Sequence, residues 1–70
     1  MRRSMQIILN GEAFETESAA TLLDLLRLLE IADRRVAVLV NDEIIRKNRH
    51  GDTQLAPGNK VEIIQMVGGG

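Results

Sequence analysis

Three glycines, Gly68, Gly69 and Gly70, end the sequence directly after an apolar segment. Glycine has the widest backbone freedom, so ordering it costs more entropy than ordering any other residue. A folded core gains nothing from such an ending, whereas a thread without side chains can enter a narrow channel and present one carboxylate. We therefore interpret the Gly70 carboxylate as the reactive group, with Gly68 and Gly69 as the residues that thread it. The alternative is a frayed end without function.

Composition excludes most other chemistry. The 70 residues contain no cysteine, so thiolate nucleophiles, disulfides and cysteine-based metal sites are excluded. The single histidine, His50, cannot hold a metal alone. It has no paired serine or carboxylate at a recognisable spacing, so we expect a loop histidine rather than a catalytic base. We predict no catalytic residue, no metal site and no cofactor bound by this chain.

The charge balance argues against nucleic acid as a partner. Nine basic and ten acidic residues leave a net charge of −1, and Phe14 is the only aromatic residue, so neither phosphate attraction nor base stacking is available. No apolar run approaches the roughly 18 residues that cross a membrane, and no signal-peptide pattern is present. We expect a single small domain in the cytoplasm.

The first part of the chain has the pattern of a β-hairpin. Residues 5–9 are predicted to form a strand, in which the two-residue side-chain period places Met5, Ile7 and Leu9 on one face and Ile8 on the other. Asn10-Gly11 follows, and a type I′ turn favours this pair because both central positions need positive φ. Residues 12–17 are predicted to return as the second strand.

A helix is predicted next. Thr21 and Asp24 have the spacing of a capping box, which makes Thr21 the expected N-cap. Leucines recur on one side of the helix, at positions 22, 25, 26 and 29. We interpret this stripe as part of the hydrophobic core; a seam that binds a partner is the alternative. Beyond the helix, Arg34-Arg35 is expected in a solvated loop; contact with an acidic partner is the alternative.

The second half predicts further strands. Residues 36–40 form a continuous apolar, mostly β-branched run, which is typical of a strand buried on both faces. Residues 43–45 are expected to form a short strand. Residues 46–52 are polar and mostly basic, and we expect a solvated loop with room for one helical turn. The last strand follows Lys60.

This order of elements predicts an α+β, ubiquitin-like β-grasp fold. One main helix packs on one face of a mixed sheet of four to five strands. In the β-grasp fold the first and last strands are parallel neighbours at the sheet centre. We divide the chain into a leader (1–4), the β-grasp domain (5–67) and a flexible glycine tail (68–70).

Several segments spread over residues 5–70 carry a family resemblance. They are Met5-Gln6-Ile7 with Asn10-Gly11, then 21–26, 38–46, 57–64 and the Val67-Gly68-Gly69-Gly70 ending. Together they resemble the ThiS family of bacterial sulfur carrier proteins of thiamine biosynthesis. The chain differs from the common family pattern at Asn59, where aspartate is usual, and at Met66, where phenylalanine is frequent.

The resemblance implies a mechanism and a set of partners. An adenylating, E1-like enzyme is expected to activate the Gly70 carboxylate with ATP. Sulfur from a persulfide, supplied through a cysteine desulfurase, then displaces AMP and leaves a C-terminal thiocarboxylate. Thiazole synthase is the expected sulfur acceptor. ATP and the persulfide belong to the partner enzymes, so the carrier itself is not expected to be an enzyme.

Docking to these partners requires a surface. If Val61 and Ile63 face the helix, Ile64 and Met66 face outward, and Ile8 on the neighbouring strand is expected to join them. Exposed contiguous apolar area tends to mark interfaces, so we predict that Ile8, Ile64 and Met66 dock the adenylating enzyme and the synthase in turn. An ordinary sheet surface or a self-association site is the alternative.

Three other functions remain open from the sequence. One is a related sulfur carrier, such as the small subunit of molybdopterin synthase or a carrier for tRNA thiolation. Another is a protein modifier that is joined to lysines through Gly70. The third is a ubiquitin-like interaction module without tail chemistry.

Overall fold

The computed structural model describes residues 4–18 and 20–66, and their elements follow the predicted order. The predicted leader and tail lie largely outside these residues, so the division into 1–4, 5–67 and 68–70 stays a prediction. Ser4, which that division assigns to the leader, is the first residue of the first strand. The elements are β1 (Ser4–Leu9), β2 (Glu12–Glu17), α1 (Leu22–Leu28), β3 (Val36–Val40), β4 (Glu43–Ile45), the 3-10 helix η1 (Lys47–Asp52) and β5 (Lys60–Gln65).

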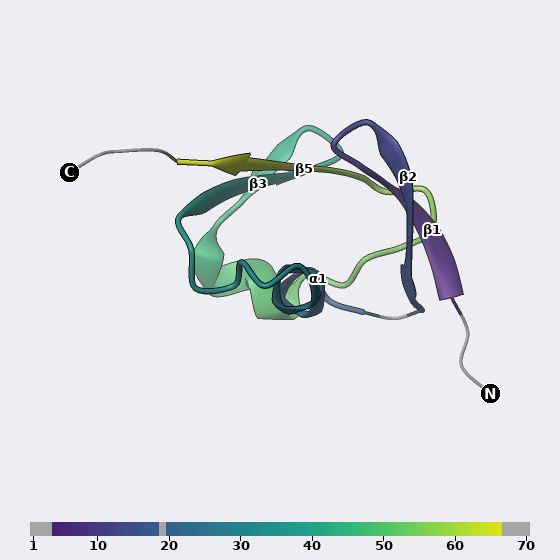
Figure 1. The fold of residues 1–70 in the computed structure, drawn as a ribbon, viewed down its shortest axis with the longest axis horizontal. Helices are drawn as coiled ribbons and strands as arrows, with labels where there is room; N and C mark the ends of the chain where they lie inside the picture. Colours follow the sequence, from purple (N-terminus) through teal and green to yellow (C-terminus); the bar gives the residue numbers. More distant parts are fainter. Residues whose placement is uncertain (1–3, 19, 67–70) are drawn as a thin grey trace.

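The five strands form one mixed sheet in the order β2-β1-β5-β3-β4, which confirms the β-grasp fold. The first and last strands, β1 and β5, are parallel neighbours at its centre, and every other pair of neighbours is antiparallel. Figure 1 shows α1 and η1 on the same side of the sheet. One sheet face is therefore covered and the other is left open. No helix in the described part of the chain is long and apolar enough to span a bilayer.

Two hairpin turns hold β5 in place. Asn10 and Gly11 have φ of 49° and 84°, as the predicted type I′ turn requires. The Asn10 Oδ1 accepts a hydrogen bond of 2.8 Å from the Ile63 N–H, and the Asn41 Oδ1 accepts one of 2.9 Å from the Lys60 N–H. Each turn asparagine thus bonds to the backbone of β5, which positions the strand that leads to the tail.

The core lies between the sheet and α1. Its fully buried members come from β1, α1, β3 and β5 and are Ile7, Leu22, Leu25, Leu26, Val38 and Val61. The prediction that residues 36–40 are buried on both faces is wrong: only Val38 is fully buried, and the other four residues are partly exposed. Ala37 and Leu39 lie on the face that the helices leave open, whereas Val36 and Val40 lie on the covered face at the ends of the strand.

The predicted capping box begins α1. The Thr21 Oγ1 accepts a hydrogen bond of 3.1 Å from the Asp24 N–H, and the Asp24 Oδ2 accepts one of 2.9 Å from the Thr21 N–H. Hydrogen bonds with Thr21 hold the pKa of the Asp24 carboxyl below its ordinary value of 3.8, and the bond from the Thr21 backbone N–H is the largest cause. A charged Asp24 therefore stabilises the folded state.

This cap predicts a pH-dependent stability. Asp24 has a lower pKa in the folded chain, so its contribution is present above the ordinary value of 3.8, which applies to the unfolded chain, and is lost as the pH falls through the folded-state pKa. Asp24→Asn should therefore destabilise at neutral pH and lose less stability than wild type on acidification. Thr21→Ala should cost about 1 kcal/mol at neutral pH.

Urea unfolding at neutral and acid pH measures both effects. Asp33→Asn is the matched control, since Asp33 is an exposed acidic residue outside the cap, and its pH profile should follow wild type. An Asp24→Asn profile parallel to wild type would contradict the role of the cap.

Candidate functional site

The open face of the sheet carries an apolar surface built by β3, β4 and β5. The register places Ala37 opposite Ile64 and Leu39 opposite Ile44. Residues directly opposite in a sheet have their side chains on the same face and in contact. Ile44 is 68% exposed and Ile64 is 53% exposed, while the two β3 residues are half-buried between their neighbours. We call Ala37, Leu39, Ile44 and Ile64 the apolar face.

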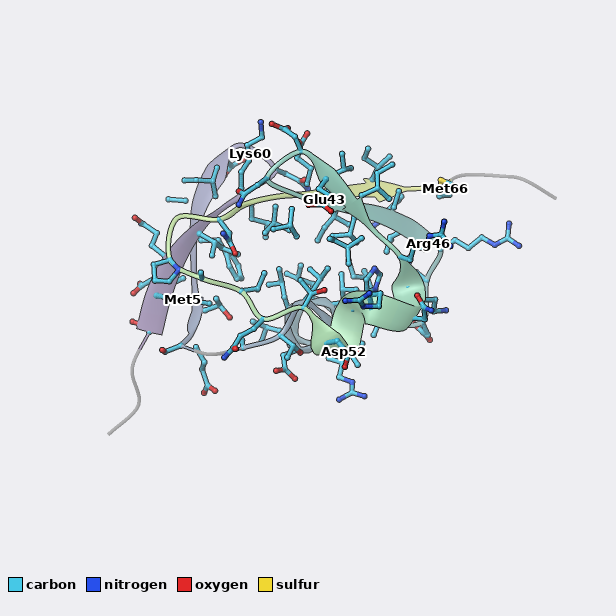
Figure 2. All side chains as sticks on the ribbon, turned by 180° about the vertical axis from the view of Figure 1, so that it is seen from behind. Met5, Glu43, Arg46, Asp52, Lys60 and Met66 are labelled. Atoms are coloured by element: carbon cyan, nitrogen blue, oxygen red, sulfur yellow. The ribbon has the colours of Figure 1, made fainter. Side chains whose placement is uncertain are left out.

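Ile8 lies on the open side of the sheet but in a different part of it. Its side chain is 37% exposed, and the β1–β5 register places it opposite Lys60. Ile64 is four residues further along β5, which corresponds to about 13 Å at roughly 3.3 Å per residue. Figure 2 shows Lys60 and Met66 well apart along β5. The structure thus groups Ile64 with residues of β3 and β4 rather than with Ile8.

Met66, the residue after β5, takes part in a different feature. It lines a pocket of about 250 Å³ between the end of β5, the α1–β3 connection and η1. Three apolar residues on the covered side of the sheet, Leu26, Ala32 and Val36, also line the pocket. Met66 is 62% exposed, so it borders both this pocket and solvent.

The base of the predicted tail is tied to the α1–β3 connection. The Met66 N–H donates a hydrogen bond of 3.0 Å to the Arg35 carbonyl oxygen, which extends the β3–β5 pairing by one residue. Gly68, Gly69 and Gly70 lie outside the described residues, so their threading and reactive roles stay predictions. Of the predicted site residues, the structure places Ile8, Ile64 and Met66.

Basic side chains gather at this end of the molecule. Residues 34–49 contain five basic and two acidic residues, although the whole chain has a net charge of −1. Arg34, Arg35 and Lys47 line the pocket, and Figure 2 shows Arg46 at the same end as Met66. Within residues 4–18 and 20–66, no ion pair involves the three pocket cations.

The one ion pair seen among the described side chains lies elsewhere. Lys60 Nζ is 3.0 Å from Asp42 Oδ1, and both side chains are largely exposed. The hydrogen bond that the Lys60 ammonium group donates to Asp42, together with the negative charges of Asp42 and Glu62, raises the pKa of Lys60. This pairing removes Asp42 from the acidic residues available to neutralise the basic end.

His50 is a packed residue of η1, as its predicted structural role requires. Its side chain is 4% exposed and its Nε2 lies 3.0 Å from the Ile45 carbonyl oxygen. A carbonyl oxygen only accepts, so the Nε2–H is the donor of this bond. The described residues contain no group of three or more histidine, cysteine or carboxylate side chains that could hold a metal ion.

Sequence reasoning missed part of the site. The apolar run at 36–40 predicts that Ala37 and Leu39 are buried, and Ile44 is predicted only as part of a short strand, so the pattern assigns none of them to an outward surface. The available signal was that one short helix cannot cover both faces of the sheet. The pocket was also missed, since its lining comes from three segments that are distant in sequence.

Comparison with known proteins agrees with the fold and the resemblance. A protein-family model described as the ThiS family matches residues 7–70. The chain is 35% identical over 63 residues to the sulfur carrier protein ThiS of Bacillus subtilis, covering 89% of this chain and 96% of that protein. The crystal structure of the thiamine biosynthesis protein ThiS from Geobacter metallireducens superposes with a TM-score of 0.81 at 26% identity, covering 94% of this chain and all of that one.

One relative is much longer than this chain. A thiazole synthase of Paramagnetospirillum magneticum is 35% identical over 66 residues, which is 94% of this chain. The chain spans only 20% of that protein's length. The similarity therefore concerns one segment of that synthase.

Proposed function

The chain belongs to the ThiS family of sulfur carriers in thiamine biosynthesis, and we propose that it carries sulfur as a thiocarboxylate on Gly70. The observation that carries the proposal is the run of three glycines directly beyond the β-grasp body. The β-grasp domain provides the exposed surfaces on which a partner enzyme docks. The glycine tail presents a carboxylate on a backbone segment that has no side chains.

The chemistry divides into three steps, all in partner enzymes. A Gly70 carboxylate oxygen attacks the α-phosphate of ATP, which releases pyrophosphate and forms an acyl-adenylate. The terminal sulfur of a persulfide then attacks the Gly70 carbonyl carbon, and AMP leaves. Cleavage of the resulting acyl disulfide by a second thiol releases the thiocarboxylate and a new disulfide. This chain has no cysteine, so partners supply both sulfur nucleophiles.

The partners follow from this chemistry. An adenylating, E1-like enzyme binds ATP and activates the tail, and a cysteine desulfurase supplies the persulfide sulfur. Thiazole synthase is the proposed acceptor of the carried sulfur. Its support is the thiazole synthase of Paramagnetospirillum magneticum, which contains a segment similar to this chain.

We place the docking surface for these enzymes on the apolar face. Contiguous exposed apolar area is typical of interfaces, and Ile44 and Ile64 are both more than half exposed. Met66 lies beyond Ile64 on the way to the tail, and it borders the pocket and solvent rather than the apolar face. A partner would contact Ile8 as well only if it spanned the sheet toward Lys60.

Intact-mass spectrometry tests the sulfur transfer. The chain is incubated with ATP, a persulfide source and the adenylating enzyme encoded in the same genome. We expect a mass gain that corresponds to exchange of one oxygen for one sulfur, located by fragmentation on Gly70. Fragmentation is needed because oxidation of a methionine to its sulfoxide adds nearly the same mass.

Leaving out ATP is the control, and the gain should then disappear. A chain that keeps its original mass while the enzyme is shown to be active would contradict the proposal. A stable ATP-dependent link between Gly70 and a lysine of another protein would instead identify a protein modifier.

A further inference from the structure

We propose that the basic pocket beside Met66 binds an acidic protein segment that presents one apolar side chain between carboxylates. The pocket is lined by the apolar residues Leu26, Ala32, Val36 and Met66, by the cations Arg34, Arg35 and Lys47, and by His50. The Nε2 of His50 is already bonded to the Ile45 carbonyl oxygen. The inference rests on the proposed function, because it places this segment on an enzyme that receives the tail.

The positive charges of the pocket favour an occupant with negative charge. Arg35 precedes β3 and Lys47 begins η1, so cations reach the pocket from two elements. No carboxylate in the described part of the chain pairs with them. Like charges at the rim of a concave site focus the field, and this attracts an anionic group more strongly than isolated surface charges do. Arginine also binds carboxylates through two parallel hydrogen bonds.

The apolar part of the pocket favours a peptide over a small anion or a nucleic acid as the occupant. Leu26, Ala32 and Val36 offer no hydrogen-bond donors from their side chains, so a free phosphate or another small anion would leave most of the pocket unused. Nucleic acid would require stacking groups, and Phe14, the only aromatic residue, lies on β2 and is not among the pocket residues. A peptide with an aliphatic side chain and flanking carboxylates satisfies both parts.

The position of the pocket indicates that the acidic segment belongs to the enzyme that takes up the tail. Met66 lines the pocket, and its N–H is bonded to the Arg35 carbonyl at 3.0 Å. An enzyme that takes up Gly70 must come within four residues of this point, which is at most about 14 Å of extended chain. The acidic segment is therefore expected beside the mouth of the channel that receives the tail.

Charge reversal tests the proposal. Arg35→Glu and Lys47→Glu should each weaken binding of the full chain to the adenylating enzyme about tenfold at low salt. The loss should shrink in about 1 M salt, where the Debye length is about 3 Å. Adenylation at saturating carrier should keep its rate, because these side chains act on docking and not on Gly70.

Arg49→Glu is the matched control. Arg49 is exposed on the same 3-10 helix as Lys47 and does not line the pocket, so an equal charge change should alter binding less than about threefold. If Arg49→Glu weakens binding as much as Lys47→Glu, a diffuse field explains the effect and the pocket proposal is overturned. Wild-type affinity in both pocket variants would overturn it as well.

Two other occupants give different results. The amide NMR signals of Ala32 and Val36 should be the same with a free and an amidated C-terminus; a shift would assign the pocket to the chain's own carboxylate and overturn the proposal. A concentration-dependent dimer that Arg35→Glu abolishes would assign it to a second copy, with the same consequence. If the wild-type chain binds the enzyme but gains no sulfur, the carrier function is refuted, and the result on docking still stands.

Discussion

Replacing Gly69 with valine is expected to slow adenylation by the cognate enzyme about 100-fold, since small misplacements of a reacting group have effects of that size. Valine adds a branched side chain one residue before the reacting carboxylate. In a channel shaped for bare backbone, this side chain prevents the carboxylate from reaching the α-phosphate. The measurement is the rate of pyrophosphate release at saturating carrier, with the thermal unfolding midpoint as the test of folding.

A second glycine provides the control for this experiment. A Cβ built at Gly51 would lie 3.6 Å from the Leu23 Cδ2 atom, which is ordinary van der Waals contact. Gly51→Ala should therefore leave adenylation unchanged, whereas Gly69→Ala should slow it. A Gly69→Val chain that is adenylated at the wild-type rate would rule out a narrow channel, although Gly70 could still be the modified residue.

Replacing Ile64 with aspartate is expected to weaken binding of the adenylating enzyme about thirtyfold. This corresponds to a loss of about 2 kcal/mol, the usual threshold for a residue that dominates an interface. The aspartate would place a charge at the β5 side of the apolar face, against Ala37 on the neighbouring strand. Titration calorimetry measures the change, and circular dichroism checks that the sheet has formed.

Ile8→Asp is the matched control for the apolar face. It makes the same substitution on the same side of the sheet, but opposite Lys60 and about 13 Å further along β5. We expect a loss of less than about threefold. Equal losses for both variants would show that the partner covers the whole open side and that Ile8 belongs to the docking surface. Wild-type affinity of Ile64→Asp would remove the apolar face from the interface.

Local patterns in the sequence determined the elements of this protein. Asn10-Gly11 predicts a hairpin because the turn has only a few permitted backbone conformations. Thr21 and Asp24 predict the start of α1 because the two reciprocal hydrogen bonds span only three residues. The glycine run points to tail chemistry from composition alone. Each of these inferences uses residues that are neighbours along the chain.

Only the tertiary structure decided which side chains share a surface. The β1–β5 register separates Ile8 from Ile64. The two-residue side-chain period within each strand fixes which face a residue takes, but not which residues of that face lie opposite each other. The partial exposure of Leu39 depends on which sheet face the helices cover. The pocket unites Leu26, Lys47 and Met66 because α1, η1 and the end of β5 meet in space. Such pairings between distant segments follow from packing the whole chain, and no local pattern encodes them.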